Sequence, residues 1–170
     1  MWAVQQHAGQ RREADGAAFV MHPIEVASLV EGDGYPDHAV AAAVLHDVLE
    51  NTDATVEDVE ERFGAEVAGL VAAVSDDPSL AGEDERKDEL RERVRRTGGY
   101  AAVVYAADKV SKVREIRIAL SAGVPRSELE GKLRRHRESL WMLEEERLGG
   151  GMAALLRAEL DALDELPHPA

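Results

Sequence analysis

The sequence predicts an all-α fold in one compact domain. Alanine, leucine, glutamate and arginine are abundant, and these residues favour helices. Alternating β-branched segments are scarce, and no Asn-Gly or Asp-Gly turn stands between two such segments. The chain has 170 residues, of which 45% are hydrophobic, and this is enough for one hydrophobic core. A compact helical bundle is therefore expected.

Proline and glycine mark where the first helices begin and end. Pro23 suits the first turn of a helix that reaches Val30, and residues 32–36 (GDGYP) end that helix. Asp37 is expected to cap a core helix over residues 38–50, which is apolar nearly all round in its first half. The same patterns predict further helices at residues 55–63, 66–74, 84–96, 100–120 and 125–147, and a loop at residues 75–82.

The last part of the chain is expected to be a separate amphipathic helix. We assign residues 1–147 to the main domain, and residues 148–170 to a glycine linker and a C-terminal helix packed on the same domain. Its leucines share one stripe at helical spacing: Leu155, Leu156, Leu160 and Leu163. Such a stripe has to dock on the body of the domain or on a partner, so an oligomeric contact through this helix stays open.

The charge pattern favours a small anionic ligand. The net charge of −14 would repel the phosphate backbone, so nucleic acid is a poor partner. Basic residues nevertheless gather at positions 11–12 and 109–117, where a local pocket could bind a small anion. No apolar run reaches the ~20 residues that span a bilayer, and the N-terminus lacks a signal-peptide pattern, so we expect no membrane partner and a cytoplasmic protein.

Three polar residues interrupt apolar segments and indicate a metal site. His46 and Asp47 follow an Ala/Val/Leu run, and Asp108 follows residues 101–107 (AAVVYAA). Burying these groups is costly unless a cation or several donors compensate. A His-Asp pair alone could be a satisfied core histidine beside a paired aspartate, but His22 at a helix start completes four ligands from three helices. With no cysteine in the chain, manganese, iron, magnesium or zinc in a nitrogen and oxygen site is expected.

Glu50 has the spacing of a general acid or base. It lies four residues after His46 and three after Asp47, so helical spacing places its carboxylate on the same face, about one turn from the metal. In contrast, His136 has no carboxylate partner at useful spacing, and we expect it to have a surface or capping role.

Four motifs, in this order, resemble a known family. They are residues 7–27 (HAGQRREADGAAFVMHPIEVA), 42–52 (AAVLHDVLENT), 63–71 (FGAEVAGLV) and 107–110 (ADKV). Over roughly residues 5–118 the chain resembles the HD hydrolase domain of RelA/SpoT-type alarmone enzymes and, more closely in size, the stand-alone small alarmone hydrolases. The resemblance implies an HD-domain helical bundle with one divalent metal, usually Mn²⁺. It also implies hydrolysis of the 3′-pyrophosphate of guanosine tetra- or pentaphosphate.

This resemblance suggests roles for residues around the metal. Glu50 could orient or deprotonate the attacking water. Arg12, Lys109 and Lys112 could neutralise the phosphates of a small nucleotide.

Three positions depart from the family's pattern and leave other functions open. Asn51 stands where the family usually has a second acidic residue, Glu13 where it commonly has lysine, and Lys112 where it usually has asparagine. Asparagine can position water or substrate but cannot act as a base. Two alternatives follow. One is a phosphohydrolase of another nucleotide, such as the 2′-phosphate of a reduced nicotinamide dinucleotide. The other is a weakened HD scaffold that binds a nucleotide or a partner protein.

Overall fold

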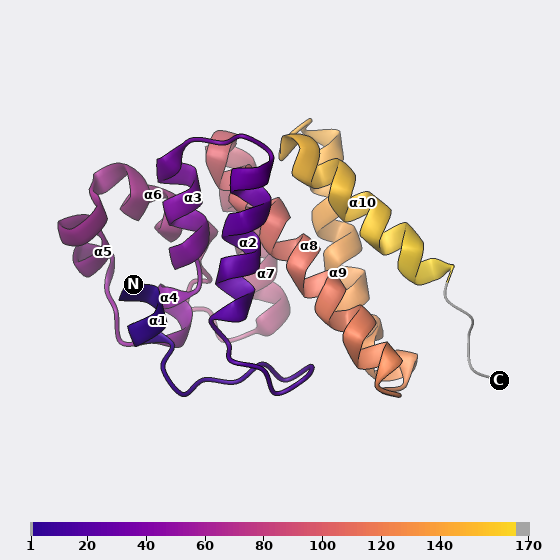
Figure 1. Ribbon diagram of the computed structural model, residues 1–170. Coiled ribbons are helices and arrows are strands. Elements are labelled where there is room, and N and C mark those ends of the chain that lie inside the picture. The colour runs from indigo at the N-terminus through magenta and orange to yellow at the C-terminus, as the bar shows by residue number, and fades with distance from the viewer. Residues whose placement is uncertain (1, 166–170) are drawn as a thin grey trace.

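The computed structural model describes residues 2–165 and confirms the all-α prediction (Figure 1). Within these residues the only β-type pairing is an isolated antiparallel bridge between Arg11 and Ala18. No helix in the same span combines the length and hydropathy that crossing a bilayer requires. The helices are α1 (Trp2–Gln6), α2 (Met21–Gly32), α3 (Asp37–Leu45), α4 (Val48–Asn51), α5 (Val56–Phe63), α6 (Ala65–Val74), α7 (Glu83–Thr97), α8 (Gly99–Ser121), α9 (Arg126–Glu145) and α10 (Gly150–Asp164).

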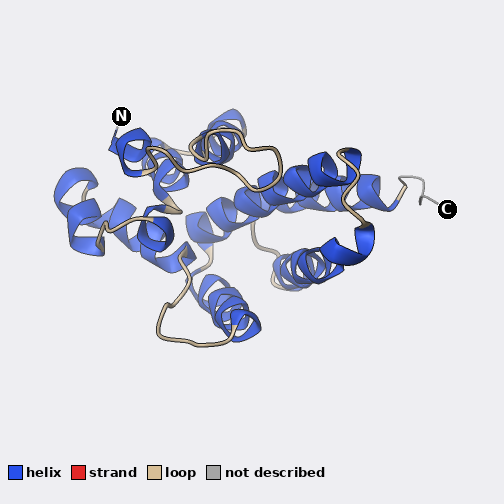
Figure 2. Ribbon diagram, turned by 90° about the horizontal axis from the view of Figure 1, so that it is seen from below, coloured by secondary structure: helices blue, strands red, loops and turns tan. Residues whose placement is uncertain are grey.

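Helix α8 is the centre of the fold. It contacts α2, α3, α6, α7, α9 and α10, and Figure 2 shows it running through the molecule with helices on both sides. Every residue from 101 to 111 is buried, as expected for a helix that is apolar nearly all round. Alanines at four of these positions keep that part of the helix thin enough for close packing. Asp108 thus lies in the interior, on the helix at the centre of the fold.

The helix expected over residues 38–50 is interrupted, which corrects the sequence prediction. Helix α3 ends at Leu45, His46 and Asp47 form a turn, and α4 begins at Val48. At the break, the His46 ring contacts the Ala43 carbonyl through Nδ1 at 2.8 Å, and the Ser75 hydroxyl, which donates to the Val71 carbonyl at 2.8 Å, also lies 3.3 Å from the His46 carbonyl. These side chains bond carbonyls near the end of α3 that a continuous helix would satisfy with its own amides.

The start of α3 also differs from the sequence prediction. Pro36 is the N-cap residue, and no side chain caps the helix. Asp37, which we expected to be the cap, is the first residue of the helix. There its negative charge is still favourable beside the helix N-terminus.

Helix α10 folds back on α8 and α9. Helix α9 ends at Glu145, two residues before the predicted end, and Gly149 takes a left-handed conformation with φ of 78° before α10 begins. A Cβ atom at Gly149 would lie 3.2 Å from the Ala106 Cβ, so this turn needs glycine. The apolar stripe of α10 packs within the chain: Leu156, Leu160 and Leu163 are buried and Leu155 is partly buried.

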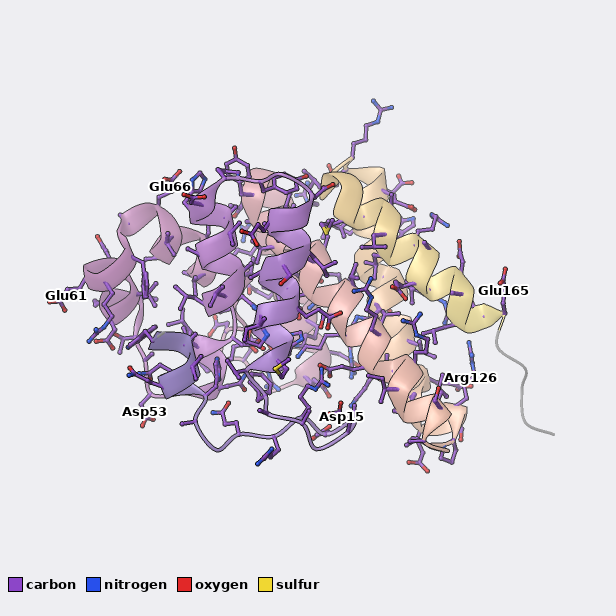
Figure 3. The ribbon with its side chains drawn as sticks, in the orientation of Figure 1. Asp15, Asp53, Glu61, Glu66, Arg126 and Glu165 are labelled. Carbon is purple, nitrogen blue, oxygen red and sulfur yellow. The ribbon has the colours of Figure 1, made fainter. Side chains whose placement is uncertain are left out.

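The far end of α10 is fixed to the start of α9. Arg126 donates to the Leu163 carbonyl at 3.0 Å and to the Asp164 carboxylate at 2.6 Å, and Figure 3 shows Arg126 beside the end of α10. The predicted segment 148–170 extends to residues 166–170, which lie outside the described part of the chain. An oligomeric contact through α10 stays a prediction.

Candidate metal centre and substrate pocket

The four predicted metal ligands converge on one buried point. His22 comes from α2, His46 and Asp47 from the turn between α3 and α4, and Asp108 from α8. The two Nε2 atoms lie 3.2 Å apart, and the Asp108 Oδ1 lies 3.1 Å from the Nε2 of His22. The Asp47 Oδ2 is 3.4 Å from each Nε2. His22, His46 and Asp108 form a group that could hold a metal ion.

Both histidines turn the same ring nitrogen to this point. The Nδ1 of His46 is held by the Ala43 carbonyl, and the Nδ1 of His22 lies 2.9 Å from the Ser111 hydroxyl. A carbonyl only accepts hydrogen bonds, so the Nδ1 of His46 is the protonated nitrogen and its Nε2 offers a lone pair. Such a contact behind a histidine is the usual support for a metal ligand.

The carboxylates at the same point have unused acceptor atoms. The Oδ2 of Asp47 and the Oδ1 of Asp108 are buried without a hydrogen-bond partner. Burial opposes ionisation of Asp108, but the adjacent Lys109 and the two imidazoles outweigh it and hold its pKa well below the usual range. Burial likewise opposes protonation of His46, yet Asp47 and Asp108 raise its pKa to about 9, so without a metal its Nε2 also carries a proton, which a bound cation would displace. A divalent cation suits this anionic point with its unpaired oxygens and inward-facing nitrogens.

Two lysines connect the ligand cluster to a pocket. The Nζ of Lys109 donates to the Oδ2 of Asp108 at 2.7 Å and lies 4.4 Å from the centre of the Tyr105 ring. The Nζ of Lys112 is 4.0 Å from the Oδ2 of Asp47 and 5.8 Å from the centre of the Phe19 ring. Burial opposes protonation of Lys112, but Asp47 and Asp108 outweigh it and raise its pKa. Both ammonium groups therefore stay charged between the ligands and the pocket.

The pocket has a volume of about 850 Å³ and a wall rich in basic residues. The α1–α2 loop and helices α7, α8 and α9 form most of its lining, and Figure 3 shows Asp15 on that loop at the lower edge of the molecule. A pocket of this size can hold a nucleotide. Its basic lining residues are Arg11, Arg12, Lys87, Lys109, Lys112, Lys132, Arg135 and His136.

Comparison with known protein families decides the assignment. A family model described as HD domain matches residues 1–141. The chain belongs to the HD domain family. This family binds divalent metal, in agreement with the His22, His46 and Asp108 group.

Relatives of this HD domain include named pyrophosphohydrolases. The guanosine-3′,5′-bis(diphosphate) 3′-pyrophosphohydrolases MESH1 of Danio rerio and Drosophila melanogaster are 36% and 37% identical over 118 and 125 residues. These matches cover 68% and 72% of the chain, and 65% and 69% of the relatives. The chain thus spans about two thirds of their length. A solved structure, described as a metazoan ortholog of SpoT that hydrolyzes ppGpp, superposes with a TM-score of 0.85 at 28% identity, covering 97% of this chain and 93% of that one.

Glu50 lies on α4 of the HD domain, just after the helix break. Its Oε1 accepts a hydrogen bond from the Asp76 amide at 2.8 Å. Desolvation raises the pKa of Glu50, and the nearby carboxylates of Asp47 and Asp76 raise it further. Asn51 follows on the same helix and lines the pocket, and its carbonyl accepts a hydrogen bond from Gln10 at 2.6 Å.

Arg12 also lines the HD domain's pocket, where acidic neighbours hold it. Its guanidinium pairs with Asp15 through two nitrogens and lies 3.8 Å from the Oε1 of Glu115. A phosphate would have to share or replace these partners. Glu13 lines the same pocket and lies 3.4 Å from the Nζ of Lys132 on α9.

Sequence reasoning missed several groups around the site. His136, which we expected to have a surface or capping role, lies in the pocket wall with a buried Nδ1 that has no partner. Burial lowers its pKa to about 3, and Lys109 and Lys112 contribute. Ser111 and Glu25, which lie behind His22, were also missed, although Ser111 stands three residues after Asp108 in the same buried run.

Proposed function

We propose that the chain is a divalent-metal-dependent hydrolase that removes the 3′-pyrophosphate from guanosine-3′,5′-bis(diphosphate). The observation that carries this proposal is the cluster of His22, His46 and Asp108, which adjoins a basic pocket through Lys109. The named activity of the relatives and the shared fold point to the same substrate. The products would be GDP and pyrophosphate.

The side chains of the site divide into three roles in this proposal. His22, His46, Asp47 and Asp108 bind the metal. When bound, a divalent ion lowers the pKa of water and screens the charge of the attacked phosphate. Glu50 orients the water or accepts its proton, because its raised pKa makes it a stronger base than an ordinary carboxylate. Asn51 positions water or substrate by hydrogen bonds.

Three basic groups bind the phosphates. Arg12 offers a planar fork that can make two hydrogen bonds to one phosphate, while Lys109 and Lys112 are point charges. The lysines lie next to the ligand carboxylates, so they would contact the phosphate nearest the metal. Arg12 is at the α1–α2 loop and would contact the more distant phosphate.

The ion itself is proposed to be Mn²⁺. Two imidazoles and two carboxylates suit manganese, and also iron, zinc or magnesium. Titration of metal-free protein with each ion, followed by activity at saturation, ranks them. Maximal activity with Zn²⁺ or Mg²⁺ would overturn the choice of manganese without affecting the site.

We further propose that residues 1–147 and the C-terminal helix form one domain in the cytoplasm. The buried stripe of α10 and the Arg126 contacts support the domain assignment.

The lining of the pocket also supports a second candidate substrate. Glu13, Asn51 and Lys112 all line it, and all three depart from the family's pattern in the sequence. These changes favour another phosphorylated nucleotide as substrate, such as a reduced nicotinamide dinucleotide from which the chain would remove the 2′-phosphate. The variant Asn51→Asp separates the two substrates. A large rate gain on the alarmone means that the natural site is attenuated for it, whereas a loss means that asparagine suits a different substrate.

The deciding experiment is pyrophosphate release from guanosine tetraphosphate with Mn²⁺. Wild type is compared with Asp47→Ala and with Asp161→Ala, a matched control at an exposed position on α10. We expect release by wild type and the control and none by Asp47→Ala. No release by a wild type that binds Mn²⁺ would overturn the alarmone assignment. Full Mn²⁺ stoichiometry in Asp47→Ala would overturn the ligand assignment.

A further inference from the structure

A chain of polar contacts starts behind His22 and leads away from the metal centre. The Nδ1 of His22 lies 2.9 Å from the Oγ of Ser111, which is fully buried on α8. The same hydroxyl donates to the Oε2 of Glu25 at 2.7 Å, one turn along α2 from His22. The Oε1 of Glu25 accepts from Arg114 at 2.8 Å. Each of the four side chains thus contacts the next, in the order His22, Ser111, Glu25 and Arg114.

The direction of these hydrogen bonds follows from the chemistry of the groups. Burial opposes ionisation of Glu25, but the hydrogen bonds from Arg114 and Ser111 outweigh it and lower its pKa, so the carboxylate only accepts. The single proton of the Ser111 hydroxyl is then committed to Glu25. Ser111 can only accept from His22, which places the ring proton on Nδ1 and leaves the Nε2 lone pair for the metal.

A second acceptor favours the same form of the ring. The Oε1 of Glu115 lies 3.5 Å from the Nδ1 of His22 and is buried without a hydrogen-bond partner. An anionic oxygen on this side also favours a proton on Nδ1. Nothing on this side of the ring would favour the alternative tautomer, whose Nε2 proton would block the metal.

The C-terminal helix holds the far end of this chain of contacts. The buried Glu159 of α10 accepts from Arg114 at 2.6 Å and from Arg117 at 2.7 Å. Arg114 therefore bridges Glu159 and Glu25, and its guanidinium cannot easily turn away from Glu25. The family match ends at residue 141, before α10 begins.

We propose that Ser111, Glu25 and Arg114 are positioning residues that fix the metal-binding tautomer of His22, and that Glu159 of α10 fixes Arg114. This inference rests on the proposed metal site and deepens it. The four residues touch neither substrate nor metal in this scheme. They act only through the His22 ring, so their first effect is on metal affinity.

Glu25→Gln is the sharpest variant, because it reverses the hydrogen bonds while keeping the shape. Arg114 donates to one oxygen of Glu25, so the glutamine carbonyl has to face Arg114 and its NH₂ group has to face Ser111. Ser111 would then accept from glutamine and donate to the Nδ1 of His22, which moves the ring proton to Nε2. Loss of such support behind a metal ligand costs about 10–100-fold in metal affinity.

The experiment measures Mn²⁺ affinity by calorimetric titration of metal-free protein, without substrate. We expect the Kd to rise by about 10–100-fold in Glu25→Gln and Ser111→Ala, and by less in Glu159→Gln. Ser139→Ala is the control for Ser111→Ala. The Ser139 hydroxyl lies 2.7 Å from the Tyr105 hydroxyl and takes no part in the contacts behind His22. Glu144→Gln is the control for Glu159, because it breaks an α9–α10 pair with Arg157. Both controls should keep the wild-type Kd.

A spectroscopic readout separates positioning from stability. In Zn²⁺-loaded, ¹⁵N-labelled protein, the hydrogen-bonded Nδ1 proton of His22 should give a low-field signal that Ser111→Ala removes and Ser139→Ala retains. The proposal is overturned if either folded variant, Glu25→Gln or Ser111→Ala, binds Mn²⁺ with the wild-type Kd. A wild type that binds Mn²⁺ but releases no pyrophosphate would overturn the substrate alone, since this test uses no nucleotide.

Discussion

Replacing Lys109 with methionine should make the stability of the chain depend on its metal. The Lys109 ammonium is the nearest cation to Asp108, at 2.7 Å, and the side chains are only 11% and 10% exposed. Methionine keeps the length of the side chain but leaves the carboxylate without this partner. Removing one member of a buried pair costs about 3–5 kcal/mol. We expect the lower end, ~3 kcal/mol, because the imidazoles of His22 and His46 remain close to Asp108.

The assay is thermal unfolding in chelator and again in Mn²⁺. For a chain of this size 1 kcal/mol shifts the Tm by about 2–4 °C, so Lys109→Met should melt about 6–12 °C below wild type in chelator. Bound Mn²⁺ would replace the lost cation in the variant, whereas in wild type it has to share Asp108 with the ammonium. The Tm rise on adding Mn²⁺ should therefore be larger in the variant.

An exposed pair supplies the control, and two results would refute this reasoning. Lys132 pairs with Glu13 at 3.4 Å, and these side chains are 52% and 92% exposed. Lys132→Met should leave the Tm unchanged, because exposed pairs contribute little. A wild-type Tm for Lys109→Met in chelator would show that Asp108 does not need the ammonium. An equal Mn²⁺-induced rise in both proteins would show that the ion does not replace it.

Three further predictions follow from the pKa shifts and the packing. The pKa of Glu50 is raised, so this residue takes up a proton at a higher pH than an ordinary glutamate. The fall of kcat/KM on the acid side of the pH profile should therefore begin at a higher pH, and Glu50→Gln should remove this acid-side fall. His136 takes up a proton near pH 3 in the folded chain and near pH 6.5 in the unfolded chain. The free energy of unfolding should therefore fall by up to ~1.4 kcal/mol for each pH unit below 6.5. Denaturant titrations of His136→Gln should lack this loss. Leu156→Ala should lower the free energy of unfolding by about 2–5 kcal/mol if α10 belongs to the same cooperative unit, and a separate early transition for α10 would contradict this.

Much of the fold could be predicted from the sequence, because its signals are local. The helix predicted at residues 55–63 forms as α5 with a capping box of Thr55 and Asp58, the helix expected near Pro23 begins two residues earlier at Met21, and the loop predicted at residues 75–82 precedes α7. The break after Leu45 could not be predicted, because the run from Ala39 to Leu45 continues with no proline or glycine before Asp47. The bounds of the short helix α1 have no clear signal in the sequence, since five residues give too little periodicity.

The ligand residues were visible because charge in an apolar run is costly. His22, His46, Asp47 and Asp108 meet in the structure, although their ligand role stays a prediction. The supporting groups carry no such signal. Ser111 is an ordinary helix residue whose partners lie 86 and 89 residues away, and these contacts depend on how α2 packs on α8. The pocket position of His136 likewise depends on how α9 packs on α8.

The break between α3 and α4 has a consequence for the His-Asp pair itself. Consecutive side chains of a regular helix point about 100° apart, and those of a strand point in opposite directions. At the turn both residues keep right-handed dihedrals, but φ of Asp47 is −96° rather than the helical value of about −63°. The Nε2 of His46 lies 3.4 Å from the Oδ2 of Asp47 in this geometry. A redesign that lengthened α3 through this turn to gain helical stability would change φ of Asp47 and rotate the two ligands relative to each other, while leaving every residue of the motif in place.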